Sequence, residues 1–109
     1  MEQSAPQYIV EVTEQNVQHL LEQSMQMPIV FAFLSPADET SQQVGGILER
    51  IANEQQGQLV LATVNIGQQQ MIAQQFGVQN VPDLKLVYQG RLANELSGSQ
   101  TEASIREWL

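Results

Sequence analysis

The stretch PIVFAFLSPADETS, residues 28–41, decides the fold of this 109-residue chain. Residues 29–34 form an unbroken apolar run, which predicts a buried strand, and Ser35-Pro36 ends that run. Residues 38–41 supply side chains that are preferred at the start of a helix. Ligands and catalytic groups gather where a central strand of an α/β sheet gives way to a helix, so this junction is the first candidate for a functional site.

The composition limits the classes of function. A formal net charge of −8 argues against binding to nucleic acid or to an anionic membrane surface, because both need basic residues. The chain contains no cysteine, which excludes disulfides, thiol catalysis and thiolate metal sites made by its own residues. We find no leader-like N-terminus and no apolar run of about 20 residues that would span a bilayer. We therefore expect a soluble, cytoplasmic protein.

Periodic apolar residues continue in both directions from the junction. Strands are predicted at 8–12, 29–34 and 59–66, helices at 14–25, 38–55 and 68–76, a hairpin at 84–88 and 92–96, and a last helix after Thr101. The order β-α-β-α-β-α-β-β-α predicts an α/β domain with a mixed central sheet of about five strands flanked by four helices. The sheet should be parallel in the middle and antiparallel at one edge.

Several positions within these elements carry specific predictions. Met25, Met71 and Phe76 should face inward at helical spacing. Gly45-Gly46 interrupts the helix at 38–55; each glycine costs about 1 kcal/mol relative to alanine, so the pair indicates a kink or a close backbone contact. Caps are predicted at the ends of the helices: Thr13, Gly57, Gly77 and Thr101.

This order, with Val-Pro-Asp at 81–83 before the hairpin, resembles the thioredoxin fold over nearly the whole chain. More narrowly, NVQHLLEQSMQMPIVFAF (16–33), QQQMIAQQFGVQNVP (68–82) and EASIREWL (102–109) resemble the N-terminal domain of the YbbN-type proteins, also called chaperedoxins (CnoX). In that family a helical tetratricopeptide-repeat region follows, and its members hold unfolding polypeptides and pass them to GroEL and DnaK chaperones. The resemblance implies that residues 1–109 are the thioredoxin-like domain of a longer chain, with repeats expected after 109.

The resemblance also implies that the redox chemistry of thioredoxins is lost. Two carboxylates and two hydroxyls occupy the place of the Cys-x-x-Cys motif: Asp38, Glu39, Thr40 and Ser41. The buried carboxylate and the lysine that assist proton transfer in thioredoxins fall at Ala32 and Thr63, and Ile66 stands where some chaperedoxins carry a further cysteine. Thiolate attack requires a thiol. We expect a domain that is not an enzyme and that needs no cofactor and no metal.

The carboxylates at the junction have other interpretations. A helix N-terminus favours the ionised carboxylate and lowers its pKa, so helix capping by Asp38 and Glu39 is favoured over an acid/base pair. A hard-cation site made by these two residues with Asp83 is an alternative. Ser41 has no histidine at motif distance, and His19 is predicted to be a partly exposed residue of another helix.

By resemblance, the functional contact lies across the groove. Pro82 is expected to be a cis-proline, with an ordinary trans turn as the alternative, and Val81 is expected to pair its backbone with an extended client segment. Asp83 would join Asp38 and Glu39 in an acidic rim that favours basic clients. The peptide-binding site is therefore predicted at Val81, Pro82 and Asp83, and a vestigial groove is the alternative.

These observations predict a redox-inactive domain of a co-chaperone. Its expected partners are unfolded or partly folded client proteins, with chaperonin and DnaK-type chaperones as further candidates. Two alternatives stay open: a thiol-disulfide oxidoreductase that relies on cysteines outside this segment, and a purely structural or dimerisation domain. Trp108 and Leu109 should either pack the last helix onto the sheet or contact the repeat region.

Overall fold

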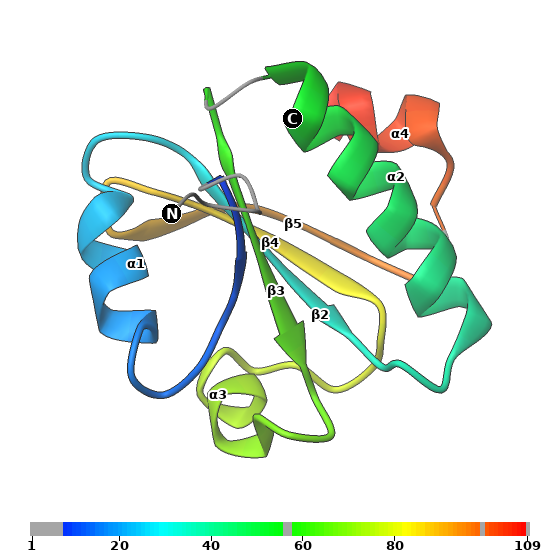
Figure 1. Ribbon diagram of the computed structural model, residues 1–109, viewed down its shortest axis with the longest axis horizontal. Helices are drawn as coiled ribbons and strands as arrows, with labels where there is room; N and C mark the ends of the chain where they lie inside the picture. The colour runs from blue at the N-terminus through cyan, green and yellow to red at the C-terminus, as the bar shows by residue number, and fades with distance from the viewer. Residues whose placement is uncertain (1–7, 56–57, 99, 109) are drawn as a thin grey trace, which may run out of the picture.

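The computed structural model describes residues 8–55, 58–98 and 100–108, and Figure 1 shows them as one sheet with helices on both faces. Its elements are β1 (Ile9–Glu11), α1 (Val17–Gln23), β2 (Ile29–Leu34), α2 (Glu39–Gln55), β3 (Val60–Asn65), α3 (Gln70–Gln75), β4 (Asp83–Tyr88), β5 (Arg91–Ser97) and α4 (Glu102–Trp108). The predicted order of strands and helices is confirmed. The predicted C-cap Gly57 and the terminal Leu109 lie outside the described residues.

The sheet is mixed and has the strand order β1-β3-β2-β4-β5. β1, β3 and β2 are parallel, while β4 runs antiparallel to β2, and β5 antiparallel to β4. β2 has hydrogen-bonded neighbours on both sides, and residues 29–33 of this strand are buried. The apolar run at 29–34 is therefore the central strand, as its composition predicts.

Alternate residues of β2 contribute side chains to two separate hydrophobic cores, one on each face of the sheet. Phe31 and its neighbours at two-residue spacing face the side of α1 and α3, where Leu20 and Ile72 complete the cluster. Val30 and Ala32 face the other side, where α2 and α4 pack. The ring of Phe76, just after α3, lies with its centroid 5.0 Å from that of Phe31, so its inward position is confirmed.

The C-terminal helix is held by the second of these cores. Ile105 is fully buried there, and Trp108 packs against the same cluster. The packing role predicted for Trp108 is therefore present. The hydroxyl of Thr101 accepts a hydrogen bond of 3.1 Å from the N–H of Ser104, which confirms the predicted N-cap.

The helices α1 and α3 are shorter than their apolar patterns predict. The C=O of Thr13 accepts from the N–H of Val17, and the side chain of Asn16 accepts from the N–H of Thr13, so a turn precedes α1 and Thr13 is not its N-cap. α1 ends before Met25, which is 57% exposed. Met71 is 61% exposed because the six-residue α3 turns only one narrow face to the sheet. The predicted inward positions of both methionines are wrong.

Gly77 and Gly90 occupy positions where the backbone has a positive φ. Gly77 ends the α3 region with φ +74°, and Gly90 forms the β4–β5 turn with φ +75°. α2 runs unbroken through Gly45-Gly46, and a Cβ on Gly45 would lie 3.1 Å from Cδ1 of Leu34. Gly45 is therefore explained by the close approach of α2 to the end of β2, whereas Gly46 has open space beside it.

Membrane-spanning candidates are absent from the described helices: none of them combines the length and the apolar character that crossing a bilayer demands.

Candidate functional site

Two predicted site segments meet at one end of the sheet. Phe33 of β2 pairs with Asp83 of β4, so Pro82 and Val81 lie beside the end of β2, where the chain turns toward α2. The Val81–Pro82 peptide bond is cis. The register therefore brings the strand–helix junction of residues 34–41 and the segment 81–83 to the same edge, as the sequence predicts.

The junction is tied together by Asp38 and Ser41. Oδ2 of Asp38 accepts from the N–H of Ser41 at 2.9 Å and from its hydroxyl at 3.0 Å. The hydroxyl oxygen of Ser41 in turn accepts from the N–H of Ser35 at 3.1 Å, and Ser41 is fully buried. Asp38 therefore caps α2, as predicted, and Ser41, at the second cysteine position of the motif, is a buried structural hydroxyl. Glu39 is exposed at the first position of α2.

Asp83 is buried and does not form an exposed acidic rim with Asp38 and Glu39. It is only 8% exposed, and because it pairs with Phe33 its side chain shares that residue's face of the sheet. Oδ2 of Asp83 is 3.6 Å from Nζ of Lys85, which is 5% exposed and also lies 2.7 Å from Oε1 of Glu95. The prediction that Asp83 joins Asp38 and Glu39 in an acidic rim is wrong.

The burial of Asp83 has an electrostatic consequence. Desolvation raises the pKa of the Asp83 carboxyl, and this effect outweighs the attraction of the Lys85 ammonium, which lowers it. Oδ1 of Asp83 is buried and has no hydrogen-bond partner among the described residues. The sequence carried a signal for this ion pair that the prediction missed: Asp83 and Lys85 alternate on one strand, and Glu95 pairs with Lys85 across the hairpin.

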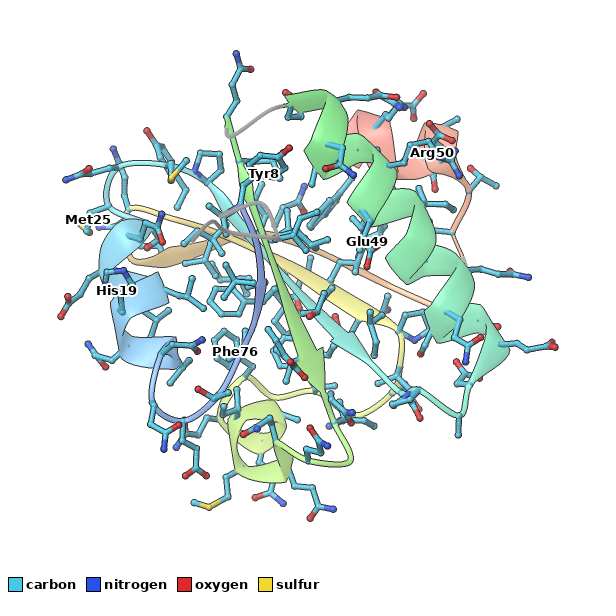
Figure 2. The ribbon with its side chains drawn as sticks, viewed as in Figure 1. Tyr8, His19, Met25, Glu49, Arg50 and Phe76 are labelled. Atoms are coloured by element: carbon cyan, nitrogen blue, oxygen red, sulfur yellow. The ribbon has the colours of Figure 1, made fainter. Side chains whose placement is uncertain are left out.

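The three carboxylates proposed as a cation site are also not brought together. Within the described ranges, no group of three or more histidine, cysteine, aspartate or glutamate side chains has the arrangement of a metal site. His19 is exposed on α1, and Figure 2 shows it on the opposite side of the molecule from α2. Ser41 therefore has no histidine beside it that could activate its hydroxyl.

The backbone of Val81 borders a cleft. In the described part of the chain, neither the N–H nor the C=O of Val81 has a hydrogen-bond partner. The C=O of Pro82 accepts from the N–H of Gly98 at 2.9 Å, which fixes the other side of this segment. This cleft is a hollow with a volume of about 510 Å³.

The lining of the hollow at Val81 is apolar at its base and amide-rich at its edge. It consists of Ile66, Gln70, Ala73, Gln74, Val78, Gln79, Asn80 and Val81. None of these side chains is charged, so the hollow offers contact area and neutral hydrogen-bonding groups. Most of these residues come from α3 and the segment after it, and among them the sequence analysis predicted only Val81 as a binding residue.

Comparisons with known proteins agree with the topology. The family model described as Thioredoxin matches residues 8–109. A thioredoxin from Nicotiana alata superposes with a TM-score of 0.82 at 17% identity, covering 98% of this chain and 94% of the other. A mutant thioredoxin from Halobacterium salinarum NRC-1 gives a TM-score of 0.79 at 21% identity, covering 97% and 91%. These two structures show the same fold.

Curated relatives extend well beyond this segment. The chain is 29% identical over 107 residues to the uncharacterized proteins Rv1324 of Mycobacterium tuberculosis and Mb1359 of Mycobacterium bovis. The match covers 97% of this chain but 35% of each relative, so the chain spans about a third of their length. The family model, the sheet order and the helices on both faces agree, and the chain belongs to the thioredoxin family.

Proposed function

We propose that this chain is a redox-inactive thioredoxin-like domain that binds extended polypeptide without a covalent bond, and that it belongs to a co-chaperone of the YbbN type. The observation that supports this best is the backbone of Val81, which has no hydrogen-bond partner among the described residues and lies at the edge of an uncharged hollow. The absence of cysteine supports the non-covalent part of the proposal, because no residue of this chain can form a mixed disulfide.

The backbone of Val81 suits a partner of variable sequence. An extended segment placed beside it would receive one hydrogen bond from the N–H and donate one to the C=O, in the manner of β-augmentation. Each such bond contributes about 1 kcal/mol net, and its strength does not depend on the partner's side chains. This selectivity for backbone over sequence is what a protein that holds many unfolded clients requires.

The hollow beside Val81 would add a modest preference for apolar side chains. Its base, which includes Ile66, Ala73 and Val78, can cover an aliphatic or aromatic group and remove it from water. The glutamine and asparagine side chains at its edge can pair with the client's backbone. The proposal therefore combines backbone pairing with shallow apolar contact, which gives weak and reversible binding.

The wider role concerns the full-length protein. Because the matching curated relatives are about three times as long as the match, the client-holding activity and any transfer to chaperonin or DnaK-type chaperones belong to a longer chain. A repeat region after residue 109 and a cytoplasmic location are parts of the same proposal.

The test uses a ten-residue apolar peptide in two forms, one unmodified and one with N-methyl groups on alternate amides. We expect the N-methylated peptide to bind about fivefold more weakly by isothermal titration, because it lacks the donor that would pair with the C=O of Val81, a bond of about 1 kcal/mol. The variant Val81→Asp should weaken the unmodified peptide to a similar degree. Ala103→Asp, which changes an exposed residue of α4, is the matched control.

Circular dichroism must first show that Val81→Asp is folded. Equal affinity for the two peptides would contradict backbone pairing even if the variant failed to fold, since that arm uses the unchanged chain. The oxidoreductase alternative is tested separately. Reduction of insulin by the full-length protein, lost when its cysteines outside residues 1–109 are replaced, would favour the enzyme over the holdase.

A further inference from the structure

A second hollow, of about 380 Å³, lies on the α2 side of the sheet and does not include Val81. Its walls come from the first half of α2, from the connection between β2 and α2, and from the ends of β1 and β3. The hollow adjoins the place of the missing Cys-x-x-Cys motif, because Ser41 and Thr63 line it, but the proposed client groove does not use this surface.

Thr63 of β3 and two glycines of α2 leave the space for the hollow. Glu11 of β1 pairs with Thr63 of β3, which pairs with Ala32 of β2, so these three side chains share the face beneath α2. Above them α2 presents Gly45 and Gly46 in place of side chains. Gly45 lets the helix approach Leu34, whereas a Cβ on Gly46 would meet no atom within 4 Å. The space beside Gly46 is therefore open.

The mouth of the hollow is negatively charged. Glu11 and Glu49 both line it, both are exposed, and neither forms a salt bridge with a described residue. Figure 2 shows Glu49 on the flank of α2 that faces β3. None of the residues that line the hollow is a lysine or an arginine. Leu34 and Pro36 add apolar surface between the two glutamates and the start of α2.

We propose that this hollow binds a basic side chain, a guanidinium or ammonium group carried on an aliphatic stem. The stem would lie against Gly46, Leu34 and Pro36, and the cation would lie between the carboxylates of Glu11 and Glu49. The hollow itself, and not the pair of glutamates alone, defines the ligand, because it accepts a chain of methylene groups that an inorganic cation lacks. The site is independent of the proposed groove at Val81.

The first experiment varies the charge of the ligand at constant shape. N-acetyl-arginine amide and N-acetyl-citrulline amide differ by the guanidinium charge alone and are titrated against the ¹⁵N-labelled chain. We expect the arginine compound to shift the amide signals of Gly45, Gly46 and Thr63, and the citrulline compound to bind several-fold more weakly. Equal binding of the two compounds, or shifts confined to other elements, would overturn the proposal.

The second experiment varies the site. Glu11→Gln and Glu49→Gln should each weaken the arginine compound about fivefold, the size expected for one carboxylate about 4 Å from a cation in water. Glu14→Gln, which removes an exposed carboxylate near α1, should leave the affinity unchanged. Gly46→Leu places a side chain between Gln42 and Glu49 on the same flank of α2 and should abolish binding. If Glu14→Gln weakens binding by the same factor, the effect comes from the net charge of the chain and the proposed site is refuted.

A third arm identifies the source of the cation. Agmatine carries the same guanidinium and stem without a peptide backbone, whereas a Gly-Arg-Gly peptide carries them within a polypeptide. Binding of both at the Gly46 signals supports a site for arginine side chains of protein partners. Binding of agmatine but not of the peptide would overturn the assignment to a side chain of a protein partner. Absence of binding by either compound refutes it.

Discussion

Replacing Lys85 with methionine should destabilise the fold far more than removing its partner Asp83. Nζ of Lys85 lies 3.6 Å from Oδ2 of Asp83, and the two side chains are 6% and 11% exposed. At an effective dielectric constant of about 20, that separation corresponds to an attraction of roughly 5 kcal/mol. Lys85→Met removes this attraction and leaves a buried carboxylate without a cation, a change that costs about 3–5 kcal/mol in proteins.

Asp83→Asn should behave differently. Burial raises the pKa of Asp83 despite the nearby ammonium, so the desolvation of its carboxylate exceeds what Lys85 returns. Asparagine avoids that desolvation, and Lys85 keeps Glu95 at 2.7 Å. We expect Asp83→Asn to change the free energy of unfolding by no more than about 1 kcal/mol, and we expect the double variant to recover most of the loss caused by Lys85→Met.

Urea unfolding of the wild type, the two single variants and the double variant measures this cycle. The pH dependence of the free energy of unfolding tests the direction of the pKa shift of Asp83. A raised folded-state pKa means that protonated Asp83 contributes stability below about pH 4, and that this contribution is lost as the pH rises through the folded-state value. The stability of the wild type relative to Asp83→Asn should therefore fall as the pH rises above about 4. Equal losses in the two single variants, or an opposite slope with pH, would refute the reasoning.

Two further predictions concern α2. Gly46→Ala should raise the free energy of unfolding by up to about 1 kcal/mol, because alanine is the better helix former and its Cβ meets open space. Gly45→Ala should raise the free energy of unfolding by less, or lower it, because its Cβ would lie 3.1 Å from Cδ1 of Leu34. Thermal unfolding of the pair tests this, and a larger gain at Gly45 would contradict it. Asp38→Ala should cost about 1–2 kcal/mol through the lost cap and the lost bond to Ser41, and a loss below about 0.3 kcal/mol would show that water replaces both contacts.

The parts of the fold that could be predicted from sequence are those set by local physics. The apolar run at 29–34 predicts a strand buried on both faces, and β2 is central because such a strand cannot lie at an exposed edge. Asp38 predicts the start of α2 because its side chain reaches the N–H of Ser41 three residues on. The β4–β5 turn follows from Gly90, whose φ of +75° favours glycine.

The sequence predictions that were wrong concern residues whose positions are set by long-range contacts. Met25 continues the apolar spacing of α1, but the helix ends first because the main chain turns to bring Ser24 against the β4–β5 turn, where its C=O accepts from the N–H of Gln89. Asp83 was expected in the rim because it lies next to Pro82 in sequence. Strand pairing with Phe33 sets its face instead, and that register is a long-range property.

The junction that opens α2 shows why a thioredoxin-family chain without cysteine need not be a damaged redox protein. Asp38 and Ser41 bond to each other, and Ser41 also bonds to the N–H of Ser35, so both positions now contribute to the packing of the loop. Cysteine is a weak hydrogen-bond donor and acceptor, and placing it at both positions would remove the cap and the buried hydroxyl together. The residues in this place act on the fold, and the proposed client contact lies at the backbone of Val81, which no side-chain substitution at the junction removes.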